Sequence, residues 1–98
     1  MAATKKIGVL IVEDENFIAQ QLAVKLEQMG YRVAGIVASG PDAIKMAGEQ
    51  RPDLVLMDII IQGPMNGIDT ATVLQRDYSL PVIFLTSHAD DATIEMAE

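Results

Sequence analysis

Apolar residues follow two alternating patterns along the chain. Short apolar runs rich in Val, Ile and Leu predict β-strands at residues 7–12, 31–37, 53–58 and 81–86. The continuous run at 7–12 is expected of a strand buried on both faces, while 31–37 is weaker because of Gly35. Between the runs, apolar residues recur every three or four positions, which is typical of amphipathic helices. These helical segments start near Asn16, Ser39 and Asn66, and a further helix is expected to begin within 90–98.

The expected helix ends carry recognisable stop and start residues. Gly30 follows the first helical segment and predicts its end, because glycine accepts the left-handed conformation common there. Ser39 and Asp42 have the spacing of a capping box, and Pro41 fits the first turn, where its missing N–H costs little. Each strand is thus followed by a helix.

Strands that alternate with helices must run parallel, joined by right-handed crossovers. The predicted fold class is therefore α/β, with a doubly wound parallel sheet. The chain has 98 residues, which is enough for one domain but leaves no room for a second. We expect a single domain over residues 1–98.

The composition excludes several classes of function. Fourteen acidic and seven basic residues give a net charge of -7, so direct binding to nucleic acid or to anionic membranes is disfavoured. The chain has no cysteine, which rules out disulfides and thiolate metal sites. No apolar stretch is long enough for a signal peptide core or a membrane span, so a cytoplasmic location is expected.

Polar and acidic residues stand directly at the ends of the predicted strands. Glu13 and Asp14 follow the first run, Asp58 ends the third and Thr86 ends the fourth. In an open parallel sheet the carboxyl ends of the strands form the ligand-binding edge. Three carboxylates meeting there would repel one another unless a cation intervened, and oxygen ligands of this kind suit Mg²⁺. A carboxylate can also act as a nucleophile and form an aspartyl phosphate, for which Asp58 is the best candidate.

Four segments together resemble the receiver domain of two-component response regulators. They are VLIVEDE at 9–15, PDLVLMDI at 52–59, MNGID at 65–69 and PVIFLTSHAD at 81–90. The resemblance spans nearly the whole chain in the family's order and spacing. It implies a flavodoxin-like receiver fold with strand order 2-1-3-4, in which a histidine kinase or a phosphorelay protein donates the phosphoryl group.

The resemblance also implies a role for each matching residue. Asp58 corresponds to the phosphoacceptor and Asp14 to the direct Mg²⁺ ligand, while Glu13 acts on the metal through water. The main-chain carbonyl of Ile60 is a further ligand, and the hydroxyl of Thr86 bonds a phosphoryl oxygen. Such a domain is a signalling module that promotes its own phosphorylation and dephosphorylation, rather than an enzyme acting on separate substrates.

The sequence departs from the family pattern at its carboxyl end. The family continues with a fifth strand bearing a phosphate-binding lysine, then a switch aromatic residue and a last helix, and none of these is found here. The chain is therefore expected to be an incomplete receiver domain. Residues 81–86 would then form an exposed sheet edge, through which a homodimer could form.

Two other functions compete with the phosphoacceptor. A Mg²⁺-dependent phosphatase with an aspartyl intermediate would need an aspartate two residues after Asp58, where Ile60 stands. A receiver-like interaction module that works without phosphorylation is the serious alternative, because the phosphate-binding lysine is missing.

Overall fold

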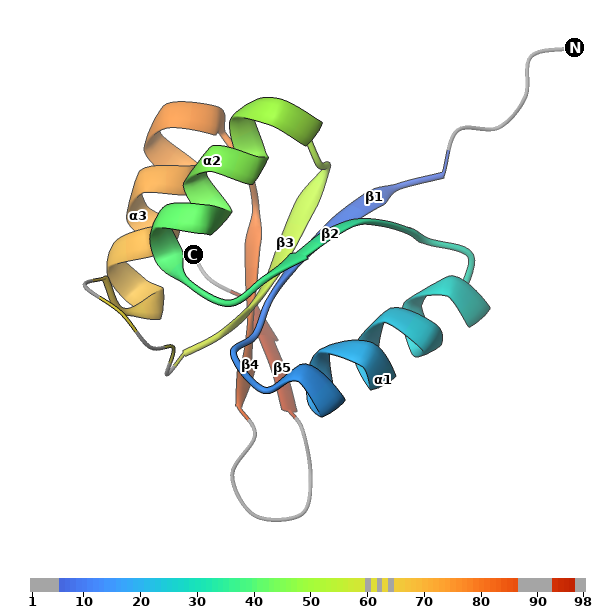
Figure 1. Ribbon diagram of the computed structural model, residues 1–98. Coiled ribbons are helices and arrows are strands. Elements are labelled where there is room, and N and C mark those ends of the chain that lie inside the picture. The colour runs from blue at the N-terminus through green and yellow to red at the C-terminus, as the bar shows by residue number, and fades with distance from the viewer. Residues whose placement is uncertain (1–5, 60, 62, 64, 87–92, 97–98) are drawn as a thin grey trace, which may run out of the picture.

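The computed structural model describes residues 6–59, 61, 63, 65–86 and 93–96, with 86 and 93–96 described by their main chain. Its elements are β1 Gly8–Val12, α1 Asn16–Gln28, β2 Arg32–Val37, α2 Gly40–Gln50, β3 Leu54–Asp58, α3 Gly67–Tyr78, β4 Val82–Thr86 and β5 Thr93–Met96. The strands form one sheet in the order β2-β1-β3-β4-β5 (Figure 1). The first four strands of this order are parallel, so the predicted α/β class and strand order 2-1-3-4 are confirmed.

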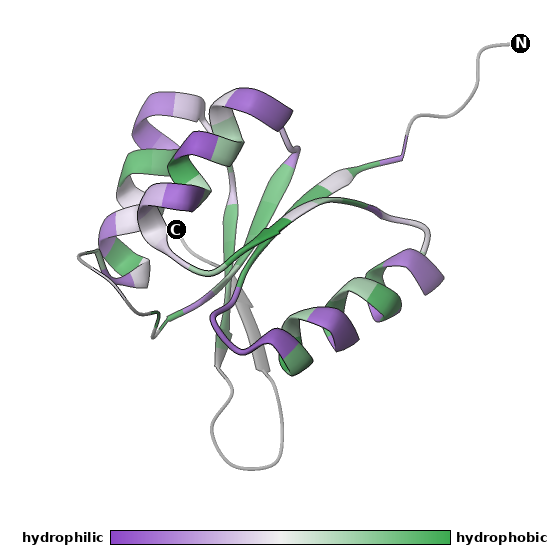
Figure 2. Ribbon diagram, in the orientation of Figure 1, coloured by the Kyte–Doolittle hydropathy of each residue, from purple (hydrophilic) through white to green (hydrophobic). Residues whose placement is uncertain are grey.

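Helices cover the two faces of the sheet unequally. Helices α2 and α3 lie side by side on one face, and α1 lies on the other (Figure 1). Alternate residues of a strand point to opposite faces, so Leu10 and Val12 join the core beneath α2 and α3, whereas Val9 packs toward α1. The central strands are largely hydrophobic, while the helices alternate hydrophobic and hydrophilic residues (Figure 2).

The predicted helix signals act as expected. The Ser39 hydroxyl accepts a hydrogen bond from the backbone N–H of Asp42 at 3.3 Å and caps α2. Asn66 caps α3 in the same way, because its Oδ1 accepts from the N–H of Asp69 at 2.8 Å. Gly30 follows α1 with a φ of 95°, a left-handed conformation that glycine adopts without strain. These caps fix where α2 and α3 begin, at the carboxyl edge of the sheet.

The prediction of a helix within 90–98 is wrong for residues 93–96. These residues form β5, which pairs antiparallel with β4 and aligns Thr93 with Thr86. Residues 90–92 and 97–98 lie outside the described residues. A short segment gains little from helix formation on its own, whereas pairing satisfies the N–H and C=O groups along β4.

The same strand corrects the expectation of an open sheet edge at residues 81–86. Because β5 pairs with Ile83 to Thr86, β4 does not offer a free edge there, and the expected homodimer through that edge loses its structural basis. The sheet thus has a short fifth strand, Thr93–Met96, which runs antiparallel to β4. No helix within the described residues has the length and apolar character needed to cross a membrane.

Candidate functional site

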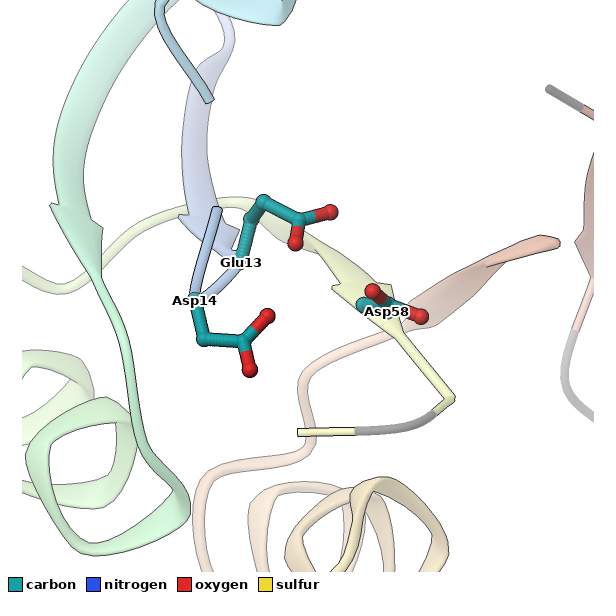
Figure 3. Close-up of side chains that lie close together, drawn as sticks. All are labelled: Glu13, Asp14 and Asp58. Atoms are coloured by element: carbon teal, nitrogen blue, oxygen red, sulfur yellow. The ribbon is translucent and has the colours of Figure 1, made fainter. Parts of the chain in front are cut away.

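Strands β1 and β3 bring the predicted acidic residues together. The two strands are parallel neighbours, and their register aligns Val12 with Met57. The next residues, Glu13 and Asp58, therefore leave the sheet side by side at its carboxyl edge. Figure 3 shows their side chains and that of Asp14 gathered beyond the ends of these two strands.

The three carboxyl groups are close enough to hold one ion. One carboxylate oxygen from each of Glu13, Asp14 and Asp58 lies within 4.8 Å of the other two. Glu13 is buried, whereas Asp14 and Asp58 are half-buried and so remain reachable from solvent. The main chain of Glu13 is fixed by its N–H, which donates to the carbonyl of Val37 at 2.9 Å. The main chain of Glu13 is thus tied to the end of β2.

Glu13 has an unusual environment for a carboxylate. Glu13 is only 2% exposed, and one of its carboxylate oxygens, Oε2, accepts a hydrogen bond from the backbone N–H of Glu15 at 3.1 Å. The other oxygen, Oε1, is buried without a hydrogen-bond partner among the described residues. Burial is the main cause that raises the pKa of Glu13 from 4.5 to about 7. The Glu15 N–H opposes this rise, while the neighbouring carboxyl groups of Asp58 and Asp14 add to it.

This donor set fits a hard divalent cation such as Mg²⁺. Carboxylate oxygens are its preferred protein ligands, and it commonly combines one or two carboxylates with water and a phosphate oxygen. Among the residues described, none gives the buried Oε1 of Glu13 the partner that a buried polar atom normally has, and a water bound to the cation would supply one. A cation would also offset the repulsion among the three carboxylates.

Two further site residues were predicted, Thr86 and Ile60, and the structure describes the main chain of Thr86. Thr86 is the last residue of β4, and the register places its neighbour Leu85 beside Asp58, so its main chain reaches the same edge of the sheet. Ile60 lies outside the described residues. The sequence did not single out Glu15, whose backbone N–H binds Glu13, because a main-chain contact leaves no residue-type signal.

Comparison with known proteins gives the same assignment along most of the chain. The model of the response regulator receiver domain matches residues 9–98. The transcriptional regulatory protein AfsQ1 of Streptomyces coelicolor is 37% identical over 87 residues, which cover 89% of this chain and 38% of that protein. The phyllosphere-induced regulator PhyR of Methylorubrum extorquens is 35% identical over 91 residues, or 92% of this chain and 34% of that one. The chain therefore spans little more than a third of these relatives.

Solved structures agree with this result. The signal receiver domain of a modulated diguanylate cyclase from Desulfovibrio desulfuricans, described as an example of alternate folding, superposes with a TM-score of 0.81. Its sequence is 43% identical, and the match covers 86% of this chain and 67% of that one. The strand order, the acidic cluster and these similarities together show that the chain belongs to the response regulator receiver domain family.

Proposed function

We propose that this domain accepts a phosphoryl group on Asp58 as part of two-component signal transduction. The observation that carries the proposal is the cluster of Glu13, Asp14 and Asp58, with carboxylate oxygens within 4.8 Å at the ends of two neighbouring strands. The donor would be the phosphohistidine of a histidine kinase or of a phosphorelay protein, acting in the cytoplasm. Residues 1–98 would serve as one receiver domain of a signalling protein.

The transfer would exchange one bond to phosphorus for another. A carboxylate oxygen of Asp58 attacks the phosphorus, the new O–P bond forms, and the P–N bond to the donor imidazole breaks with its electron pair leaving on nitrogen. Asp58 suits this role because it ends a buried strand, so its backbone is held in place. Positioning of this kind, rather than acid–base chemistry, is the main contribution of a protein to phosphoryl transfer.

Bound Mg²⁺ would neutralise charge on the phosphoryl oxygens and on the acidic cluster. Asp14 and Asp58 would be its direct carboxylate ligands, and Glu13 would hold a metal-bound water with its buried Oε1. We further propose that the carbonyl of Ile60 completes the protein ligands. The hydroxyl of Thr86 would bond a phosphoryl oxygen, which is supported by the position of Thr86 at the end of β4.

In this scheme the domain promotes its own phosphorylation and dephosphorylation and has no other substrate. A receiver-like interaction module that works without phosphate is less favoured. It would give no role to a buried carboxylate whose Oε1 lacks a partner in the described part of the chain.

Intact-protein mass spectrometry after incubation with Mg²⁺ and acetyl phosphate tests the proposal. We expect one phosphoryl adduct on the unchanged chain, none on Asp58→Asn, and one on Asp53→Asn. Asp53 is a suitable control because it lies at the opposite end of the same strand. An unmodified wild-type chain, or an adduct that persists in Asp58→Asn, would refute Asp58 as the acceptor.

A further inference from the structure

Helix α3 begins with a glycine whose presence is not explained by its backbone conformation. Gly67 is buried and occupies the first position of α3, directly after the capping residue Asn66. Among the described glycines, positive φ values occur at Gly30 and Gly63, so Gly67 has a conformation open to any residue. Alanine would favour the helix more than glycine does. The reason for a glycine must therefore lie in what surrounds it.

The surroundings of Gly67 are the main chain of the proposed acceptor residue. A Cβ atom at Gly67 would lie 2.7 Å from the carbonyl oxygen of Asp58 and 2.7 Å from that of Ile59. It would also lie 3.1 Å from the carbonyl carbon of Ile59. These are backbone atoms, which cannot rotate away as the tip of a side chain can. The Gly67 N–H also donates to the Ile59 carbonyl at 3.3 Å.

Helix α3 is poorly placed to retreat from an added methyl group. Thr70 is fully buried in its first turns, and the Thr70 hydroxyl donates to the carbonyl of Asn66 at 2.9 Å. Thr70 also lies against Gly40 of α2. The contact is so close that a Cβ atom added at Gly40 would overlap the hydroxyl oxygen of Thr70. A methyl group at Gly67 would therefore displace the Asp58–Ile59 main chain.

We propose that Gly67 is a positioning residue for Asp58. By lacking a side chain, it lets the first turn of α3 rest against the carbonyls of Asp58 and Ile59 and fixes the direction in which the Asp58 carboxylate leaves β3. This inference rests on the proposed function, since it gives Gly67 a role in placing Asp58 within 4.8 Å of Glu13 and Asp14. Gly67 acts through Asp58 and does not itself contact the phosphoryl group.

Substitution by alanine tests the geometry, and the chain offers a matched control. Gly48 is an exposed glycine of α2, where a Cβ would first meet the Tyr78 hydroxyl at 3.2 Å, the movable end of a side chain. In metal-free NMR spectra, Gly67→Ala is expected to shift the amide signals of Asp58 and Ile59, whereas Gly48→Ala leaves them in place. Unchanged Asp58 and Ile59 signals in Gly67→Ala would overturn the inference.

Mg²⁺ binding measured by calorimetry tests the consequence for the site. Gly67→Ala is expected to weaken binding by about tenfold or more, the usual size of losing a contact that orients a metal ligand, and Gly48→Ala to match wild type. Equal affinity in Gly67→Ala and wild type would overturn the inference. Failure of the wild-type chain to bind Mg²⁺ would instead count against the proposed function and leave the amide-shift test to decide on Gly67.

If Gly67→Ala does not fold, hydrogen exchange measured on the unchanged chain tests the contact between Gly67 and Ile59. The first N–H groups of a helix lack partners within the helix, so they normally exchange quickly with solvent. The contact with Ile59 predicts slow hydrogen exchange at the Gly67 amide. Exchange there as fast as at an exposed amide would show that the contact is absent and would overturn the inference.

Discussion

The neighbouring strands β1 and β3 form a pair with acidic residues near each end, Asp53 before β3 and Glu13, Asp14 and Asp58 at the carboxyl edge, and the two ends use them differently. At the amino end, the Asp53 carboxylate accepts the N–H of Gly8 at 2.7 Å, and the Asp53 N–H donates to the Gly8 carbonyl at 2.7 Å. At the carboxyl end, Glu13 is buried with one oxygen unpartnered among the residues described, beside the carboxyl groups of Asp14 and Asp58.

The difference separates a structural carboxylate from a functional one. The Asp53 carboxylate has a hydrogen-bond partner within the fold, the N–H of Gly8, and this contact extends the pairing of β1 and β3. Within the described part of the chain, Oε1 of Glu13 has no hydrogen-bond partner, and the raised pKa of Glu13 indicates that the fold disfavours its charged form. Such a group costs stability, and an unfavourable arrangement of this kind is typical of binding and catalytic sites. The carboxyl edge is therefore the end suited to a ligand.

The largest stability effect is expected at Glu13. Its folded pKa of about 7 lies above its ordinary value of 4.5, so its contribution to stability is full below pH 4.5 and is lost as the pH rises toward 7. Glu13→Gln should remove this loss and stabilise the metal-free protein at pH 8 by about 1–3 kcal/mol. Urea unfolding of both proteins from pH 4.5 to 8 measures it. Parallel pH profiles for the two proteins would mean that Glu13 keeps an ordinary pKa.

A smaller effect of opposite sign is expected at Asp53. Asp53→Ala removes the acceptor of the Gly8 N–H and should lower the free energy of unfolding by about 1–2 kcal/mol. The loss is smaller than for a buried hydrogen bond to a charged group, because Asp53 is exposed. Urea unfolding at pH 7 gives the value. The fall in stability between pH 4.5 and 7 should persist in this variant, since Glu13 is unchanged. If the stability of Asp53→Ala did not decrease between pH 4.5 and 7, the amino and carboxyl ends of the strand pair would be coupled, which would contradict their separate roles.

Much of the fold was predictable because its signals are local. The short apolar runs predicted the first four strands, and Ser39 with Asp42 marked the start of α2. The acidic cluster followed from a topological rule, since parallel strands end at one edge and Glu13, Asp14 and Asp58 stand at strand ends.

The incorrect predictions depended on contacts that a local pattern does not encode. Residues 93–96 form a strand because β4 offers them a partner. Helical spacing of apolar residues does not show which of them are covered: Met29, the C-cap residue of α1, is 63% exposed, and Ile68 of α3 is 60% exposed. Gly67 was not singled out either, since its close approach to Asp58 is visible only in three dimensions.

Titration calorimetry with Mg²⁺ at pH 7 tests most directly whether the carboxyl edge is a metal site. The wild-type chain should bind one ion, binding should be lost or strongly weakened in both Asp14→Asn and Asp58→Asn, and Asp53→Asn should bind like wild type. No binding by the wild-type chain, or the same loss in Asp53→Asn as in Asp58→Asn, would contradict a site built from Glu13, Asp14 and Asp58 at that edge.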